Sequence, residues 1–437
     1  MRTSFFDEPA RVVVISFVGV GLLGGAILTL PTAAHGEPIA LRDALFTAFS
    51  AVCVTGLSTL DVGTRLTGFG QVVLLALIQI GGLGIMAFSI ATVAALRRKL
   101  SVSETELLSY MLEQRNRSEV LSNLRTVLRY TLGIEAIGAL VLTVAFVSAG
   151  YEIAPALWHG VFHSISAFCN AGFSLYSDSL GAIAHMPLAM TTISILIVAG
   201  GLGFATLTWL RQRDPNYRLA AQVSLSAAAL LIAVAAVVFY LAERRSLLSD
   251  MSLASRYGHA LFQSVTLRTA GFSTVEFADA ARATLLIVLP FMAIGAASGG
   301  TAGGVKVGTA YVLVQDLARL TRRRRDIVAA GRRIPDPVAS KASAIVLMFT
   351  AFVGLATLIL AAYTTEPLEQ IVFEVVSALG TVGLSSGVTG RLDGFGLAVL
   401  VACMLVGRLG PLTLVGALRQ PEATVMTRYP KGNLPIG

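Results

Sequence analysis

The chain has 437 residues, of which 55% are apolar and only 13% are charged. Soluble domains carry about 25% charged residues, and a soluble protein of this size needs more charge to cover its surface. With a mean hydropathy of +0.76, the composition excludes a disordered regulator and a disulfide-stapled secreted domain. It indicates a multi-pass membrane protein. The three cysteines and five histidines form no pattern typical of a zinc site.

Eight apolar stretches are long enough to cross a membrane, which takes about 20 residues. They lie near residues 11–31, 70–96, 124–150, 187–210, 219–242, 283–315, 338–363 and 394–418. A shorter, half-polar stretch separates the two members of each successive pair, near 41–54, 155–170, 257–269 and 367–381. Segments of that length are typical of re-entrant or buried helices. The sequence therefore predicts an all-α polytopic membrane protein with eight transmembrane helices, in which a unit of helix, short segment and helix occurs four times.

The distribution of basic residues predicts the orientation of these units. We expect the four repeats at 1–98, 99–214, 215–325 and 326–437, the last with a C-terminal tail. With both termini on one side, that side carries 23 Lys and Arg residues and the opposite side seven. The positive-inside rule places both termini in the cytoplasm, and it explains most of the +8 net charge without a nucleic-acid partner. Basic loops at 97–129, 211–218 and 316–341 offer a surface for lipid or a protein partner.

The four short stretches share one sequence pattern. In each, a Phe is followed four residues later by Ser or Thr and then by a Gly that precedes Leu or Phe. The Ser or Thr is Ser50, Ser166, Thr266 or Ser377, and the glycine is Gly56, Gly172, Gly271 or Gly383. Residues at i and i+4 lie on one face of a helix, whose C-terminus carries a partial negative charge. Glycine then permits backbone conformations that other residues resist. The pattern predicts a short helix followed by an extended turn.

Extended backbone within a membrane is tolerated where it is buried in protein or lines a water-filled path. Four such turns about one axis, with fourfold pseudosymmetry, present rings of carbonyl oxygens that can replace the hydration shell of a monovalent cation. The sequence TVGL at Thr381–Leu384 is close to the TVGYG of potassium channels. The predicted filter residues are Val54, Thr55, Gly56, Leu57, Asn170, Ala171, Gly172, Phe173, Thr269, Ala270, Gly271, Phe272, Thr381, Val382, Gly383 and Leu384.

A gate is predicted beside this filter, because the sixth long stretch is interrupted by GAASGGTAGG between Gly295 and Gly304. Glycine costs about 1 kcal/mol per residue in a helix, so the helix should break there. A broken membrane helix typically borders a conduction path; a purely structural kink is the alternative. The predicted gate residues are Gly295, Ser298, Gly299, Gly300, Thr301, Gly303, Gly304, Lys306 and Arg408.

Charged residues inside the apolar stretches are functional candidates, because burying charge in a membrane is expensive. We expect Arg408 to line the pore below the filter, with an ion pair to Glu374 as the structural alternative. Lys306 can instead extend toward the cytoplasmic interface, and Arg268 is expected to brace the third turn from behind. Glu135 suggests either a proton relay or a buried pair between closely packed helices.

Four glycine-centred segments with a glycine-rich third inner helix resemble the Trk/Ktr/HKT superfamily of potassium transporters over essentially the whole chain. One apolar stretch precedes the first segment and all four filter positions are Gly, which favours the Ktr branch. The resemblance implies K⁺ as the transported ion, stimulation by Na⁺ and a location in the bacterial cell membrane. It also implies a homodimer with Tyr429 and Gly437 at its interface. Nucleotide control would then act only through a cytosolic ring of RCK subunits.

Other classes of function fit the residues less well. A Na⁺-conducting or H⁺-coupled carrier with alternating access also uses broken helices, but here the predicted repeats share one orientation. A membrane enzyme would need a nucleophile with its base or a pair of carboxylates, and neither is evident. The segment Gly19–Gly24 matches GxGxxG but no strand precedes it. His159 and His163 lie one helical turn apart without a third metal ligand.

Overall fold

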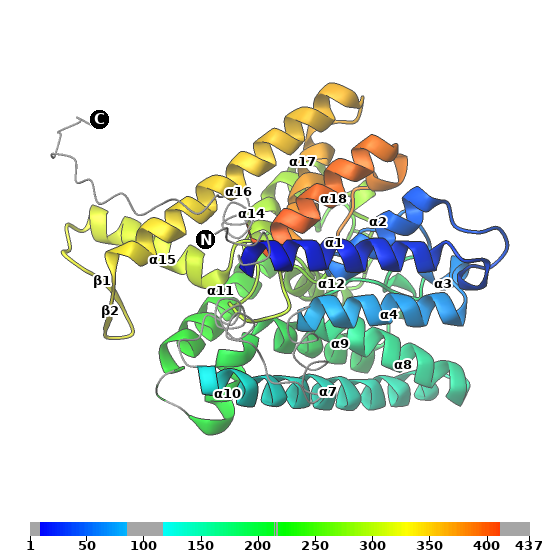
Figure 1. Cartoon of the computed structure of the whole chain (residues 1–437), viewed down its shortest axis with the longest axis horizontal. Coiled ribbons are helices and arrows are strands. Elements are labelled where there is room, and N and C mark those ends of the chain that lie inside the picture. The colour runs from blue at the N-terminus through cyan, green and yellow to red at the C-terminus, as the bar shows by residue number, and fades with distance from the viewer. Residues whose placement is uncertain (1–8, 85–116, 214, 216, 411–437) are drawn as a thin grey trace, which may run out of the picture.

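The computed structural model describes residues 9–84, 117–213, 215 and 217–410, and these are mostly helical (Figure 1). The two residues predicted at a dimer interface, Tyr429 and Gly437, lie outside the described residues. So does most of the basic loop predicted at 97–129.

Helices occur at every position where an apolar span is expected. They are α1 (Pro9–Leu28), α4 (Gly68–Leu83), α7 (Arg117–Ser148), α9 (Pro187–Gly201) with α10 (Gly203–Gln212), α11 (Arg218–Glu243), α13 (Arg282–Ile287) with α14 (Leu289–Ala293) and α15 (Val307–Thr321), α16 (Asp336–Tyr363) and α18 (Gly394–Leu409). Among the described residues, Thr126–Ser148, Arg218–Glu243 and Asp336–Tyr363 are long and apolar enough to cross a membrane, and α9 with α10 adds a fourth if the bent pair is one span. The count of eight spans stays a prediction.

Four short helices coincide with the four half-polar stretches. They are α2 (Leu41–Val52), α8 (Ile153–Phe168), α12 (Leu253–Thr266) and α17 (Leu368–Gly380). The Phe of each shared pattern is buried, at 1% exposed for Phe46, 0% for Phe162, 4% for Phe262 and 0% for Phe373. Each short helix packs on the long helix that precedes it: α2 on α1, α8 on α7, α12 on α11 and α17 on α16. The buried Phe therefore anchors each short helix.

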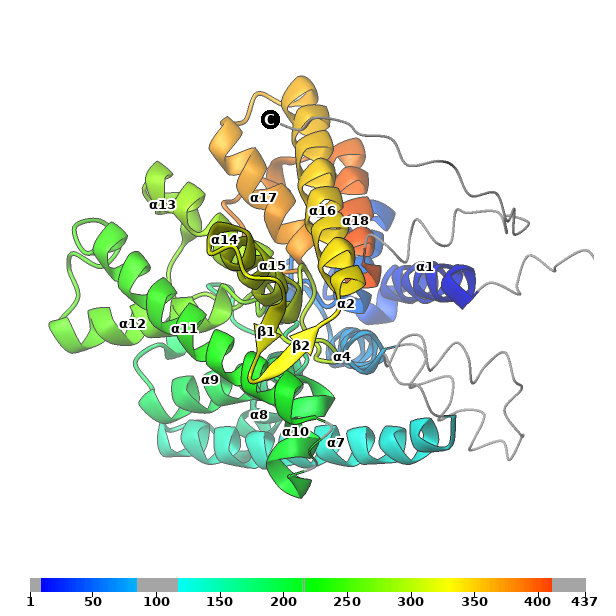
Figure 2. The ribbon, with the colours of Figure 1, turned by 90° about the vertical axis from the view of Figure 1, so that its left-hand side faces the viewer.

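The short helices and their neighbours close into a ring. Helix α4 contacts α8, α9 contacts α12, α14 contacts α17, and α18 returns to contact α2. In Figure 2 the blue helices lie to the right, the cyan and green ones at the bottom and left, and the orange ones at the top, around a common centre. The C-terminal ends of α2, α8, α12 and α17 are thereby brought to the middle of the molecule.

One element departs from the all-helical prediction. Strands β1 (Ile327–Ala329) and β2 (Arg332–Ile334) pair antiparallel between α15 and α16, within the predicted basic loop. The turn residues Ala330 and Gly331 both have positive φ, as a two-residue hairpin requires. Strands of three residues are too short to produce a recognisable alternation, so sequence patterning missed them. The remaining short elements are α3 (Val62–Arg65) and the 3₁₀ turns Pro31–Ala33, Gly181–Ile183, Phe277–Asp279 and Thr389–Arg391.

The span predicted at 187–210 is strongly bent, because Pro187–Gly201 and Thr206–Gln212 meet at an angle of 98°. Gly203, at the bend, has a φ of +73°, which a continuing helix does not allow. The sequence Gly-x-Leu-Gly at this bend recurs where α4 and α18 end, at Gly81–Gly84 and Gly407–Gly410. The last glycine has positive φ in all three places. This recurring motif was a usable signal that sequence patterning overlooked.

Candidate functional site

The turns that follow the four short helices have the same backbone shape. Each contains two residues of positive φ, a non-glycine residue and, two positions later, the patterned glycine. The non-glycine residues are Val54, Asn170, Thr269 and Thr381, at 54°, 58°, 64° and 50°, and the glycines are Gly56, Gly172, Gly271 and Gly383, at 100°, 72°, 80° and 93°. A left-handed non-glycine residue costs about 1–2 kcal/mol. Such strain persists where the surrounding packing enforces it, so the four turns are held in one geometry.

The four glycines meet in a closed ring. A Cβ atom placed on any one of them would lie less than 3.0 Å from the carbonyl oxygen of the residue that precedes the glycine of the next turn. The successive pairs are Gly56 with Ala171, Gly172 with Ala270, Gly271 with Val382, and Gly383 with Thr55. Real Cβ atoms essentially never approach an atom that closely. Only glycine fits at these positions, and backbone carbonyl oxygens surround the ring.

The patterned Ser and Thr side chains brace the turns in two ways. In the first and fourth turns, the hydroxyl oxygens of Ser50 and Ser377 accept hydrogen bonds from the N–H groups of Gly56 and Gly383, at 3.0 and 3.1 Å. In the second and third turns, the hydroxyls of Ser166 and Thr266 donate to the carbonyl oxygens of Phe173 and Phe272, at 2.8 and 2.6 Å. Each turn is thereby fixed to its own helix.

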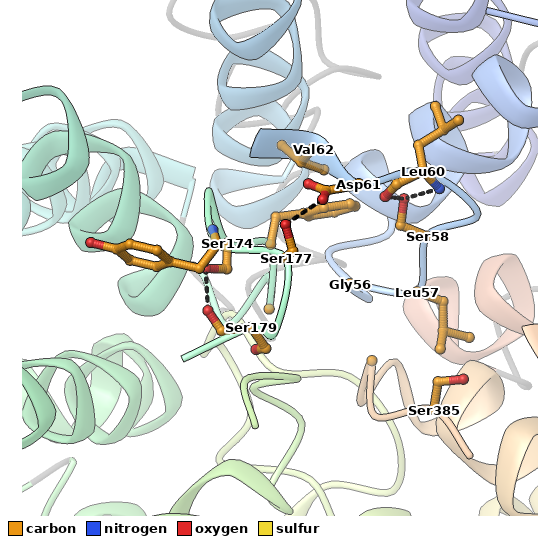
Figure 3. A pocket seen from close by; sticks show the side chains of 14 residues that line it. Gly56, Leu57, Ser58, Leu60, Asp61, Val62, Ser174, Ser177, Ser179 and Ser385 are labelled. Atoms are coloured by element: carbon orange, nitrogen blue, oxygen red, sulfur yellow. Dashed lines mark hydrogen bonds between the residues drawn. The ribbon is translucent and has the colours of Figure 1, made fainter. Parts of the chain in front are cut away.

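A cavity of about 180 Å³ opens at one end of the ring (Figure 3). Three of the four ring glycines line it, together with residues that follow them in the chain, including Asp61, Ser174, Ser177 and Ser385. Asp61 is the one charged side chain among the lining residues that the structure describes. Sequence reasoning missed Asp61, because nothing in its local pattern places it beside the glycines.

The glycine-rich segment lies at the other end of the ring. The chain breaks as predicted, since α14 ends at Ala293 and α15 begins at Val307. The Thr381 hydroxyl occupies the space that a side chain on Gly303 would fill, and a Cβ on Gly295 would lie 3.6 Å from the methyl of Thr269. The segment therefore faces residues that precede the ring glycines, whereas the cavity is lined by the glycines and the residues after them.

Backbone hydrogen bonds hold this segment in place. At its base, the N–H of Gly295 donates to Val305 at 2.9 Å, and Ile294 and Val305 form a parallel bridge. Its middle is fastened to the end of α9, because the N–H groups of Ala297 and Thr301 donate to the carbonyl oxygens of Gly201 and Gly200, at 3.0 and 3.1 Å. The Thr301 hydroxyl also donates to the last residue of α8, Phe168, at 3.1 Å.

Arg408 joins the glycine-rich segment to α4. Its guanidinium donates to the carbonyl oxygen of Thr301 and to that of Gly81, at the end of α4. The alternative, an ion pair with Glu374, is wrong, because the carboxylate of Glu374 instead accepts hydrogen bonds from the chain after the fourth turn. Lys306 precedes α15 and donates to the carbonyl oxygen of Ala302 within the segment. Both predicted basic residues of the gate thus contact the glycine-rich segment.

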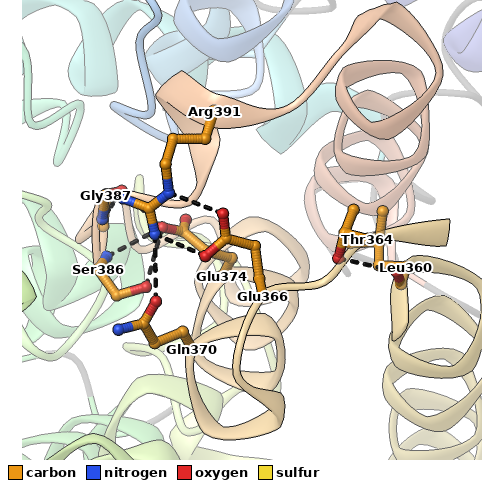
Figure 4. A network of polar contacts seen from close by, with 9 residues as sticks. Leu360, Thr364, Glu366, Gln370, Glu374, Ser386, Gly387 and Arg391 are labelled. Atoms are coloured by element: carbon orange, nitrogen blue, oxygen red, sulfur yellow. Dashed lines mark hydrogen bonds and ion pairs between the residues drawn. The ribbon is translucent and has the colours of Figure 1, made fainter. Parts of the chain in front are cut away.

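Glu374 belongs to a polar network behind the fourth turn (Figure 4). Its buried carboxylate accepts hydrogen bonds from the hydroxyls of Ser385 and Thr389, at 2.6 and 2.9 Å, and from the N–H of Ser386 at 2.9 Å. At the edge of this network, Arg391 forms an ion pair with Glu366 at 2.8 Å. The network fastens the chain beyond Gly383 to α17.

The remaining candidates occupy positions behind the turns. The Glu135 carboxylate accepts from the amide of Gln79 at 3.2 Å, so its pair is with a neutral side chain of α4. His163 contacts the Ser174 hydroxyl at 3.0 Å and thereby supports the wall of the cavity. Arg268 is buried at the end of α12, with 7% of its surface exposed, and its role as a brace stays a prediction.

The mostly helical fold, with apolar helices around a ring of backbone turns, defines the class of multi-pass membrane transport proteins. The chain matches the family profile described as "TrkH: Cation transport protein" over residues 12–425. The protein therefore belongs to the TrkH family of cation transport proteins, which is not an enzyme family.

Several curated relatives of this chain are named as potassium uptake proteins. The chain is 35% identical to the Ktr system potassium uptake protein B of Bacillus subtilis, over 98% of this chain and 97% of the relative. It is also 35% identical to the potassium/sodium uptake protein NtpJ of Enterococcus hirae, with the same coverage. Among solved structures, the potassium transporter TrkH of Vibrio parahaemolyticus matches with a TM-score of 0.73 at 21% identity, covering 95% of this chain and 85% of that one. That match supports the fold.

Proposed function

We propose that this protein is the translocation subunit of a potassium uptake system and conducts K⁺ through the glycine ring. The observation that carries the proposal is the closed succession of four turns, in which each ring glycine adjoins a carbonyl oxygen of the next turn. Carbonyl oxygens arranged in rings replace the water around an alkali cation. The carbonyl groups proposed to do so include those of Thr55, Ala171, Ala270 and Val382.

The short helices favour a cation at the same place. All four end within five residues of their ring glycine, so their C-terminal partial negative charges converge on the ring. Inward movement of K⁺ needs no chemical step in this chain, because the membrane potential supplies about 2.3 kcal/mol per charge for each 100 mV. The proposed chain architecture is four repeats with eight spans, arranged with fourfold pseudosymmetry around one pore.

The glycine-rich segment is the proposed gate. It lies at the end of the ring opposite the cavity and is fastened by α9, α8 and Arg408. The fixed positive charge of Arg408 raises the barrier for a cation, and its hydrogen bond to Thr301 keeps the segment in place. The residues from Gly295 to Lys306 then open the path only when these contacts change.

The orientation and partners follow from basic charge and from the relatives' names. We place both termini in the cytoplasm and the protein in a bacterial cell membrane, with the cavity facing outward. The name of one relative includes sodium, which supports Na⁺ as a stimulating ion. Another relative is named as part of a "Ktr system", which supports the presence of a partner protein. We propose that this partner is a cytosolic nucleotide-binding RCK ring and that the chain forms a homodimer on it.

Rubidium uptake into liposomes that contain the full-length protein tests this function. We expect uptake that saturates with Rb⁺, exceeds Na⁺ uptake and rises when Na⁺ and the ring partner are added. Rates far above roughly 10³ per second per protein support a pore, as expected for conduction without alternating access. Slow uptake that depends on a proton or Na⁺ gradient would instead support the carrier alternative.

A further inference from the structure

We propose that the cavity beside the glycine ring binds a partly hydrated alkali cation, with the Asp61 carboxylate as its counter-charge. The inference rests on the proposed function, because it takes this cavity as the entrance to the conduction path. It adds a binding site ahead of the ring, formed by side chains rather than by backbone carbonyl groups.

The charge on Asp61 is not neutralised by a basic neighbour. Its recorded partners are the Ser177 hydroxyl at 2.5 Å and the N–H groups of Gly63 and Thr64 at 2.9 and 3.2 Å. No Lys, Arg or His is among its partners in the part of the chain that the structure describes. Partial burial alone would raise the pKa of Asp61, but these hydrogen bonds outweigh burial and hold its pKa below the ordinary 3.8. Asp61 is therefore ionised at neutral pH.

Nearby contacts keep this carboxylate at the cavity wall. Asp61 is the N-cap of α3 and is also bound to Ser177, which belongs to the chain after the second turn. The closest basic residue along the chain, Arg65, is directed elsewhere and donates to the carbonyl oxygens of His35 and Glu37, at 3.1 and 3.2 Å. Neutral donors thus fix the carboxylate, while the guanidinium of Arg65 is hydrogen-bonded to a different loop.

The cavity has the size and chemistry that a cation with some of its water requires. Its volume of about 180 Å³ is many times the roughly 10–15 Å³ that one water needs, so it has room for a cation with several of its waters. Hydroxyl groups of Ser58, Ser174 and Ser385 line it, and hydroxyl oxygens can accept the hydrogen bonds of the remaining hydration water. A cation here lies beside three of the four ring glycines.

The kinetics of Rb⁺ uptake by the full-length protein in liposomes test this site through Asp61→Asn. Asparagine keeps the shape and the N-cap acceptor but removes the charge. We expect the KM for Rb⁺ to rise about threefold to tenfold at low ionic strength with the maximal rate unchanged. The difference should shrink when a large impermeant salt screens the charge, and the preference for Rb⁺ over Na⁺ should stay at the wild-type value.

Two further variants separate charge from structure. Asp61→Glu keeps the charge, so its KM should lie closer to that of the wild type than to that of Asp61→Asn. Asp178→Asn removes an exposed acid that follows Ser177 in the chain but does not line the cavity, and its effect should be much smaller. An unchanged KM in Asp61→Asn, a shift that salt does not reduce, or an equal shift in Asp178→Asn would overturn the site. Absence of Rb⁺ uptake by the wild type would contradict the proposed function itself.

Discussion

The glycine ring and the glycine-rich segment beneath it are built from the same residue type but are held in different ways. In the ring, backbone of the next turn fills the space beside each glycine, and a hydroxyl from the preceding helix braces each turn. In the segment, Ser298 and Gly299 are exposed. The fastening there comes from other elements: carbonyl groups at the ends of α8 and α9, and the side chain of Arg408.

This difference indicates that the ring and the glycine-rich segment have separate roles in the proposed conduction path. The ring is fixed by many short-range contacts, so a change there should alter which ion passes. The segment depends on a few groups of neighbouring elements, so in the proposed gate a small displacement of α9 or Arg408 should release it. Changes in the segment should therefore alter how fast ions pass and leave the preference among ions intact.

The largest expected effect comes from Gly383→Ser. A Cβ atom at Gly383 would overlap the carbonyl oxygen of Thr55, so the ring must distort. We expect the ratio of Rb⁺ to Na⁺ uptake to fall by about tenfold or more, which corresponds to a loss of about 1.4 kcal/mol in discrimination. Paired isotope uptake into liposomes measures this ratio.

Gly150→Ser is the matched control for that variant. Gly150 has a φ of +95°, close to the +93° of Gly383, but nothing lies within 4 Å of its Cβ position. Both serines therefore suffer the same backbone strain, and only the one at position 383 meets another turn. Equal losses of selectivity in the two variants would show that strain, rather than the ring, is responsible.

Deletion of residues 295–304 should have the next largest effect. Ile294 and Val305, which flank the deletion, lie side by side in a parallel bridge. A parallel pair cannot be joined by a tight turn, so a short flexible linker replaces the deleted residues. With the obstruction gone, we expect basal Rb⁺ flux to rise about tenfold, or about 1.4 kcal/mol in the barrier, at unchanged Rb⁺/Na⁺ preference. Normal or reduced flux from a folded, monodisperse variant would reject the gate.

Arg408→Ala should raise flux by a smaller factor. Alanine removes the positive charge and both hydrogen bonds but leaves the segment itself in the path. Arg408→Lys sharpens the comparison, because lysine keeps the charge but lacks the planar fork that reaches two carbonyl groups. If the fastening matters more than the charge, Arg408→Lys should behave like Arg408→Ala; flux at or below the wild-type level in Arg408→Ala contradicts the proposed role.

The smallest effects should come from the network of Figure 4, where the buried carboxylate of Glu374 and the partly exposed one of Glu366 lie close together. Glu374→Gln weakens three or four hydrogen bonds to the fourth turn, and we expect it to lower the free energy of unfolding by about 2 kcal/mol. Glu366→Gln removes an ion pair at the surface and should cost less than about 1 kcal/mol. Thermal unfolding in detergent compares the two; equal costs would contradict the role of Glu374 behind the turn.

The ion pair of Glu366 should also depend on pH in a defined direction. The hydrogen bond from Arg391 lowers the pKa of Glu366 below its ordinary 4.5. Its contribution to stability is therefore fully present at neutral pH and is lost as the pH falls through the lowered pKa. The difference in melting temperature between wild type and Glu366→Gln should begin to shrink as the pH falls below the ordinary 4.5 and vanish once the pH lies below the lowered pKa. A difference that stays constant throughout this acid range would contradict the assignment.

Sequence patterning predicted the parts of the molecule that repeat. The Phe, the Ser or Thr and the glycine of each short stretch recur four times, and such recurrence reveals a local structure that a single copy does not. The break near Gly295 was also predicted, because glycine disfavours a helix through its own backbone.

The parts that sequence patterning missed depend on contacts between distant segments. Asp61 reaches the cavity only because Ser177, from another turn, binds its carboxylate. Glu374 accepts from residues beyond Gly383, and Arg408 reaches a carbonyl group 327 residues away in α4. A carboxylate or guanidinium in a sequence does not reveal its partner, so the ion pair considered between Arg408 and Glu374 was wrong.

The most direct test of the central claim is to locate the ion. Crystals of the protein grown with Rb⁺ and measured at the rubidium absorption edge should show an anomalous peak on the axis of the ring formed by Gly56, Gly172, Gly271 and Gly383. We predict that carbonyl oxygens of all four turns surround that peak. A strong rubidium peak elsewhere in the membrane region, with none inside the ring, would contradict the account.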